Sequence, residues 1–221
     1  MATMSAEASS VHYTFGEELA NSVTHGLGLV LSIAGTIALL NAPGLAGSPG
    51  AVAACSVYGA TLILLYAAST LYHSARQATT QRRLRTLDHL AIFLLIAGTY
   101  TPFVLIALRG TWGWTLFGII WTLAAVGVAV ELSRLRHVRG LMVTLYISMG
   151  WIGLVAIKPL VAALPAAGLW LLFGGGVSYT FGVLFYRWHT LRYHHALWHL
   201  FVLGGSVLQY FAIFYYVLPR A

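Results

Sequence analysis

Long apolar runs alternate with short segments rich in polar residues, glycine and proline along most of this 221-residue chain. A helix that crosses a membrane needs about 20 mostly apolar residues, and these runs reach that length. The pattern predicts seven membrane-spanning helices, at residues 21–41, 51–73, 88–108, 112–132, 141–160, 166–187 and 195–217. The runs lack the alternation of apolar and polar positions that lipid-facing strands show, so we expect an all-α seven-helix bundle.

Composition supports the same class of protein. The chain is 59% hydrophobic and only 8% charged, whereas soluble domains carry about 25% charged residues. No long polar linker interrupts the runs, so residues 14–221 are predicted to form one membrane domain and residues 1–13 to be disordered. The first twenty residues lack the basic and then apolar start of a cleavable signal peptide. The single cysteine, Cys55, excludes an intramolecular disulfide.

The basic residues predict the orientation of the bundle. The net charge of +7 does not indicate nucleic-acid binding, because the basic residues lie in short loops between apolar runs. Nine of the twelve fall in alternate loops: Arg76, Arg82, Arg83, Arg85, Arg134, Arg136, Arg139, Arg187 and Arg192. The positive-inside rule then places the N-terminus in the cytoplasm and the C-terminus outside.

Local patterns add two further expectations. Thr14 followed by Glu17 fits a capping box, so a helix is predicted to begin there. Glu131 is expected to pair with Arg134 three residues later. The histidines outside or at the edge of the apolar runs are expected on the solvated surface: His12, His137, His189 and His194.

Polar residues gather at one predicted depth, near the cytoplasmic face. They come from four spans: Glu18, Asn21 and His25 at the first, Ser69 and His73 at the second, Asp88 and His89 at the third, and His195 and His199 at the seventh. Ionisable groups in a membrane are costly unless they pair with one another or bind something. The shared depth therefore predicts a functional site.

Helical spacing suggests which ligand such a site would take. His195 and His199 are four residues apart, so both rings project from one helix face. With His73 they would offer three nitrogens to a Zn²⁺ ion and leave a fourth position for water, as in catalytic zinc sites. Asp88 is the best-placed carboxylate to act beside that water, and Ser69 shares a helix face with His73.

Each of these residues also has a simpler interpretation. A His-x-x-x-His pair alone is often structural, and His73 alone could donate to a free carbonyl at the end of its helix. Asp88 alone could cap the start of the third span. Glu18 could complement the positive end of the first helix. The metal hypothesis is favoured over these simpler interpretations only because the polar residues of four spans share one predicted depth.

Three ordered motifs carry a resemblance to a known family. They are Glu18-x-x-Asn21-x-x-x-His25, Ser69-x-x-x-His73 followed by Asp88, and His195-x-x-x-His199, with a further characteristic stretch over residues 87–103. With these motifs on seven spans, the chain resembles the bacterial hemolysin III proteins of the progestin and adipoQ receptor superfamily. The resemblance implies zinc held by His73, His195 and His199, with Asp88 near its water and Ser69 beside the site.

The resemblance also suggests a chemistry. Adiponectin receptors and alkaline ceramidases of this superfamily are linked to hydrolysis of lipid amides, above all ceramide, which implies a membrane lipid as substrate. The alternatives are a non-catalytic sensor or regulator with a structural zinc, in which Asp88 or His89 completes a closed site, and a pore-forming cytolytic protein. A pore should carry polar residues across the whole membrane, and here they stop near one face. The sequence makes no prediction of oligomeric state.

Overall fold

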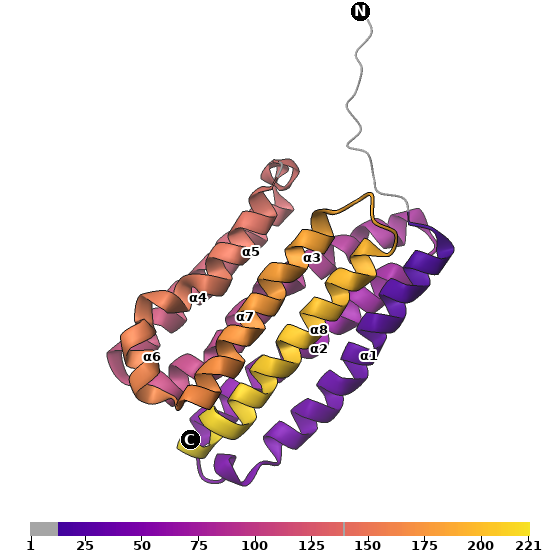
Figure 1. Cartoon of the computed structure of the whole chain (residues 1–221). Helices are drawn as coiled ribbons and strands as arrows, with labels where there is room; N and C mark the ends of the chain where they lie inside the picture. The colour runs from indigo at the N-terminus through magenta and orange to yellow at the C-terminus, as the bar shows by residue number, and fades with distance from the viewer. Residues whose placement is uncertain (1–12, 139) are drawn as a thin grey trace, which may run out of the picture.

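The computed structural model describes residues 13–138 and 140–221, which form a bundle of helices with no strand among them (Figure 1). The helices are α1 (Phe15–Leu40), α2 (Pro49–Ser74), α3 (Ala78–Pro102), α4 (Gly110–Leu132), α5 (Leu141–Trp151), α6 (Ile157–Ala163), α7 (Ala166–Arg187) and α8 (His194–Ala212). Shorter helical turns extend or connect them: η1 (Pro43–Leu45), η2 (Phe103–Leu108), η3 (Arg134–His137), η4 (Ile152–Ala156), η5 (Ile213–Val217) and η6 (Leu218–Arg220).

The prediction of an all-α bundle with seven membrane-spanning helices is confirmed. Seven helical segments of the described chain are long and apolar enough to cross a membrane. Four of these are the single helices α1, α2, α4 and α7. The third span joins α3 to η2, the fifth joins α5 to η4 and α6, and the seventh joins α8 to η5 and η6.

Two spans begin at least six residues earlier than the hydropathy pattern predicts. The first helix starts at Phe15, and the predicted capping box is present: the Thr14 hydroxyl accepts from the Glu17 N–H, and the Glu17 carboxylate accepts from the Thr14 N–H at 2.9 Å. The third starts at Ala78 rather than at residue 88, because the arginine-rich stretch before it is also helical. Asp88 therefore lies inside α3, and its interpretation as an N-cap is wrong.

The most buried spans are the second and third, which occupy the middle of the bundle. Helix α1 packs on α2 and α8, α7 packs along α8, and α3 packs along α2 and α4. Helix α5 makes few contacts with α3, α4 and α7, and Figure 1 shows α4 and α5 set apart from α7 and α8. The bundle is therefore tightest around α2 and loosest between α5 and α7.

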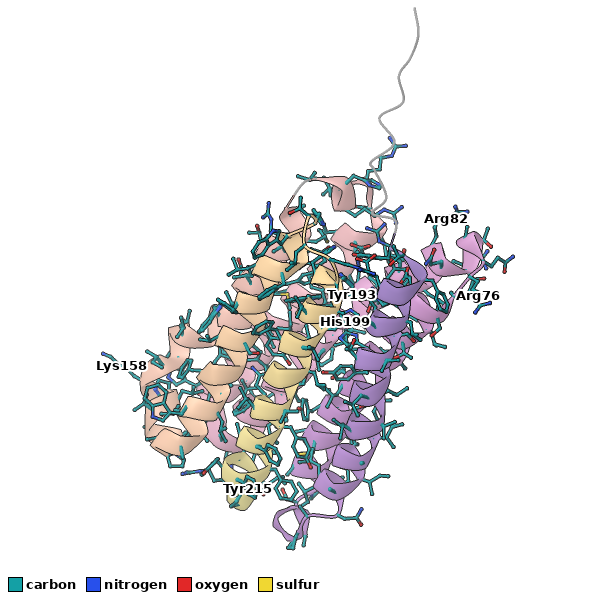
Figure 2. The ribbon with its side chains drawn as sticks, turned by 45° about the vertical axis from the view of Figure 1, so that its right-hand side comes forward. Arg76, Arg82, Lys158, Tyr193, His199 and Tyr215 are labelled. Carbon is teal, nitrogen blue, oxygen red and sulfur yellow. The ribbon has the colours of Figure 1, made fainter. Side chains whose placement is uncertain are left out.

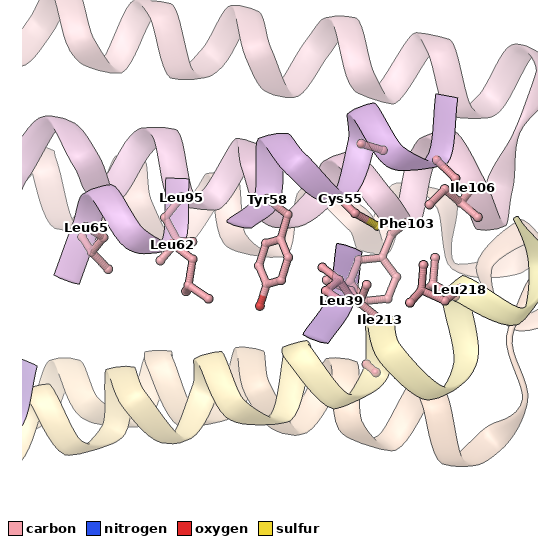
Figure 3. Packing of buried hydrophobic residues seen from close by; sticks show 14 of the residues in the cluster. Leu39, Cys55, Tyr58, Leu62, Leu65, Leu95, Phe103, Ile106, Ile213 and Leu218 are labelled. Carbon is pink, nitrogen blue, oxygen red and sulfur yellow. The ribbon is translucent and has the colours of Figure 1, made fainter. Parts of the chain in front are cut away.

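The main hydrophobic core extends along the bundle, from Leu39 and Leu218 at the end away from the start of α1 to Ala68 and Ala91 near the histidines. Figure 3 shows Tyr58, Phe103 and Ile213 within it, at a junction of the second, third and seventh spans. Helices α2 and α3 approach closely where Gly98 faces Thr61, since a Cβ at Gly98 would collide with the Thr61 side chain. Close backbone approach at small residues is how membrane helices gain packing energy.

The two ends of the bundle differ in character. Figure 2 shows Arg76, Arg82 and Tyr193 at the end where α1 begins, and Tyr215 near the opposite end. We call the end with Arg76 and Arg82 the arginine-rich end. The start of α1, the end of α2 and the start of α8, which carry histidines, lie at this end (Figure 2). That this end faces the cytoplasm stays a prediction.

Replacement of Gly98 by alanine should destabilise the bundle, because the new methyl group has to displace the Thr61 side chain. Overpacking of this kind costs about 1–3 kcal/mol, which should appear as a lower Tm of the detergent-solubilised protein. Gly118→Ala is the matched control, since no atom lies within 4 Å of its Cβ position. Equal Tm values for the two variants would contradict the close packing.

The predicted orientation can be tested by labelling with a membrane-impermeant maleimide. Cys55 is the single cysteine and is fully buried, so the background should be low. A cysteine placed at Arg83 should react only after cells are opened, whereas one at Gly47 should react on intact cells. The opposite pattern would place the N-terminus outside.

Candidate metal centre

Three histidines from two helices converge at the arginine-rich end of the bundle. His73 lies in the last turn of α2, and His195 and His199 lie in the first two turns of α8. Nitrogen atoms of these three side chains lie within 4.8 Å of one another, and among the described residues no other histidine, cysteine or acidic side chain joins the group. The structure thus brings together the three residues predicted as metal ligands.

The ring of His73 is oriented by helix α1. Its Nδ1 lies 2.6 Å from the Glu18 carboxylate and 3.4 Å from the side-chain amide of Asn21. Because the carboxylate can only accept, Nδ1 is the donor, and Nε2 is the nitrogen that a neutral ring would offer to a metal ion. That Nε2 is buried and has no hydrogen-bond partner. The second Glu18 oxygen accepts from Gln81 of α3 at 3.4 Å, so the carboxylate is held from two sides.

The ring of His199 is oriented in a similar way by the backbone of α1. Its Nδ1 lies 3.1 Å from the Asn21 carbonyl and 3.2 Å from the Thr24 hydroxyl. A backbone carbonyl only accepts, so Nδ1 of this ring is also the donor, and Nε2 is the nitrogen that a neutral ring would offer to a metal ion. Outer hydrogen bonds of this type fix the tautomer and direction of metal-ligating histidines in proteins.

The unpartnered atoms fit a metal ion. Besides the Nε2 of His73, the Nδ1 of His195 is buried and makes no hydrogen bond. Buried polar groups without partners are rare in folded proteins, and several together indicate that a bound species is expected between them. Three neutral imidazoles suit Zn²⁺ and related first-row ions. The residues present therefore fit a group with three protein nitrogens.

A cavity of about 170 Å³ opens beside the histidines. Its walls come from α1, α2, α3, α5, α7 and α8 and are mainly apolar, with Ser69, Asp88, His195 and His199 at the histidine end. Ser69 is fully buried and its hydroxyl has no partner. The two residues predicted to act beside the metal thus line the same cavity as two of the histidines.

His25 also lines this cavity, but it is not one of the three histidines whose nitrogens could share a metal ion. Its ring is stacked on that of His199, with centroids 3.5 Å apart and planes 14° from parallel. Both of its nitrogens are buried without partners. The three residues of the α1 motif thus contact the histidine group: Glu18 at His73, His25 at His199 and Asn21 at both.

His89 and Glu131 correct a sequence prediction. Glu131 does not pair with Arg134: its carboxylate lies 3.2 Å from the Nδ1 of His89, joining α4 to α3. Glu131 is 3% exposed, and a buried carboxylate is better satisfied by a neighbouring helix than by a side chain that can reach water. Neither His89 nor Asp88 joins the metal-binding group of the described residues, so the group itself does not form a closed four-ligand site.

Aromatic residues cover the site from the arginine-rich end. Residues 1–12 of the segment expected to be disordered lie outside the described chain, but Tyr13 is described, and its ring centroid lies 5.3 Å from that of His195. Burial raises the pKa of the Tyr13 phenol well above its usual range, so the hydroxyl stays neutral. His194, expected on the surface, is instead 2% exposed, and its Nδ1 lies 3.1 Å from the Phe185 carbonyl.

Sequence reasoning missed the roles of Tyr13, His194 and the Glu131–His89 pair. Each depends on a contact outside its own helix, and the spacing of residues within one helix does not indicate it. The loop before α8 is another such case: Tyr193 has a left-handed backbone (φ 58°), and its N–H donates to the Glu17 carboxylate at 3.2 Å. Helix α1 therefore positions both the loop and the rings that follow it.

Comparison with known proteins agrees with these features. The family model for haemolysin-III-related proteins matches residues 13–210. The chain is 48% identical to "Hemolysin-3" of Bacillus cereus, over 93% of this chain and 94% of that protein, and 43% identical to the "Hemolysin-3 homolog" of Bacillus subtilis, over 92% and 96%. It is 27% identical to the human "Monocyte to macrophage differentiation factor", over 91% and 84%.

The family match covers the capping box, all three motifs and both helices that carry the histidine group. The similarity to the two Bacillus proteins extends over almost the full length of this chain and of each of those proteins. The chain is therefore a multi-pass membrane protein that belongs to the haemolysin-III-related family.

Proposed function

We propose that this chain is a zinc-dependent hydrolase of lipid amides, acting in the cytoplasmic membrane of a bacterium with its histidine site near the cytoplasmic face. The observation that carries the proposal is the position of the three histidines at the polar end of a mainly apolar cavity. A lipid with a long chain and an amide group matches that distribution of polarity.

The residues of the site suit amide hydrolysis. Zn²⁺ held by His73, His195 and His199 would supply Lewis-acid polarisation and lower the pKa of a nearby water. Asp88 accepts a proton from the attacking water and returns it to the amine nitrogen as the C–N bond breaks, which leaves a fatty acid and an amine. The unpartnered Ser69 hydroxyl donates to the carbonyl oxygen as that oxygen gains charge.

The loose contact between α5 and α7 favours entry of the substrate from the bilayer. Residues of both helices, including Tyr146 and Val183, line the cavity wall. An acyl chain that enters there would move from lipid into a mainly apolar channel with little change in its surroundings. The amide of a ceramide-like lipid would then reach the histidine end.

The alternative is a non-catalytic sensor in which a structural zinc ties α2 to α8. The contacts of α1 with both His73 and His199 favour this reading, because they make the site a junction of three helices. A cytolytic pore is less favoured, since the cavity beyond the histidines is mainly apolar. The name of the two Bacillus relatives is the argument for that third function.

The metal content of the purified protein distinguishes a zinc site, catalytic or structural, from a network of histidines without metal. The purified chain should carry about one zinc ion per molecule, measured by elemental mass spectrometry, and His73→Ala and His195→Ala should lose it. His137→Ala, at an exposed position outside the cluster, is the matched control and should keep it. A metal-free wild-type chain would overturn the proposal.

Catalysis is tested separately with a fluorescent ceramide in lipid nanodiscs. Asp88→Asn should keep its zinc but hydrolyse the lipid about 10²–10⁴-fold more slowly, because it removes the proton carrier. Wild-type zinc content with no hydrolysis of any lipid amide would favour the sensor. Hydrolysis at the full rate by Asp88→Asn would exclude the role proposed for this carboxylate.

Glu18 should control zinc affinity through its contact with His73. Glu18→Gln removes the negative charge that faces Nδ1 and should weaken zinc binding about tenfold or more, as measured by competition with a chelator. Glu17→Gln is the control, since Glu17 caps α1 and contacts Tyr193 rather than a histidine of the group. Equal affinities for the two variants would show that the Glu18 contact is incidental.

A further inference from the structure

The cavity continues well beyond the histidines, to a second polar position on α8. Gln209 follows His199 by ten residues (199 to 209) on the same helix and lines the same cavity. It also lines a smaller cavity of about 50 Å³, together with Thr99 and Tyr100. At 1.5 Å per helical residue, Gln209 lies roughly 15 Å from His199 along the axis.

Two polar side chains at this position line a mainly apolar cavity, Gln209 from α8 and Thr99 from α3. Thr99 is 6% exposed, and the other two buried threonines, Thr61 and Thr101, donate to carbonyls of their own helices at 2.9 and 2.8 Å. The Tyr100 hydroxyl is already satisfied, since it donates to the Gly150 carbonyl and accepts from the Gly153 N–H.

The fold makes room for the Gln209 side chain. Gly175 of α7 lies directly against it: a Cβ at that glycine would come within 2.6 Å of the Gln209 Cγ and 3.0 Å of the Gly205 carbonyl. A polar amide inside a membrane bundle is costly when it is unpaired. The close approach of α7 at Gly175 therefore confines the Gln209 side chain to one position in the cavity wall.

We infer that Thr99 and Gln209 form a subsite for a hydroxyl group carried partway along the acyl chain of the lipid. The inference rests on the proposed function, because it takes the polar end of the lipid to lie at the histidines. An extended chain advances about 1.2 Å per bond, so 15 Å corresponds to roughly 12 bonds. The hydroxyl would therefore lie near carbon 12.

The chemistry of the pair explains why a hydroxyl fits. A plain methylene chain that passes Thr99 and Gln209 can neither donate to them nor accept from them, so it makes no hydrogen bond at this position. A hydroxyl both donates and accepts, so it can bond the amide oxygen and the threonine hydroxyl at once. The subsite should favour the hydroxylated chain about tenfold or more.

Binding of three fatty acids tests the subsite without requiring catalysis. The zinc-loaded full chain is titrated with stearic acid, 12-hydroxystearic acid and 6-hydroxystearic acid, each competing with a fluorescent fatty acid. The 12-hydroxy acid should bind about tenfold more tightly than either of the others. Equal affinities for the two hydroxy acids would overturn the subsite while leaving the lipid-binding proposal intact. If no acid displaces the probe, both fail.

Variants of Gln209 distinguish recognition from a structural role. Gln209→Met keeps most of the side-chain volume but removes the amide, so it should abolish the preference for the 12-hydroxy acid over stearic acid while the zinc content stays that of the wild type. Gln77→Met, at the exposed start of α3, is the control for the same chemical change. If the amide serves ligand recognition and not folding, Gln209→Met should not lower the Tm. A drop of several degrees would indicate a structural amide and overturn the inference.

Discussion

The hydrocarbon core of a bilayer contains no water, so a polar side chain there can form hydrogen bonds only with the protein or with a ligand that the protein binds. This constraint explains the uneven plan of the bundle. One end is closed by aliphatic and aromatic packing around Phe103 and Ile213. The other end contains imidazoles and carboxylates that satisfy one another through contacts such as Glu18 with His73 and Glu131 with His89. The atoms that remain unpaired mark where a ligand belongs.

Helix α1 has an unusual part in this arrangement. It is among the less buried spans and packs mainly on α2 and α8. Yet it supplies the groups that orient His73 and His199, through Glu18 and the Asn21 carbonyl. Its apolar surface faces the membrane while its polar surface orders the site. Much of the site's geometry therefore depends on a helix that contributes no ligand to the three-histidine group.

The sequence predicts the helices far better than it predicts their contacts. Hydropathy located all seven spans, because length and apolarity are local properties, and it failed at Ala78, where the helix continues into charged residues. Shared depth was enough to group His73 with His195 and His199. The rotation of each helix about its axis is set by packing between distant segments. For that reason, the partner of Glu131 and the burial of His194 were wrongly predicted.

Gln209 illustrates a signal that the sequence does carry. It is an amide within an apolar run, and only the structure reveals that it faces the cavity at a distance from the histidines.

The histidine group is also distributed along the chain in a way that matters for its synthesis. His73 and the α1 residues that orient it enter the membrane early, whereas His195 and His199 belong to the final helix. During translation, α1 and α2 are inserted before α8. The polar atoms of His73 that face the site therefore stay without their final neighbours until α8 has been inserted. The site is therefore complete only after α8 has been inserted, and a chain cut short before α8 would expose the unsatisfied imidazole of His73 to membrane quality control.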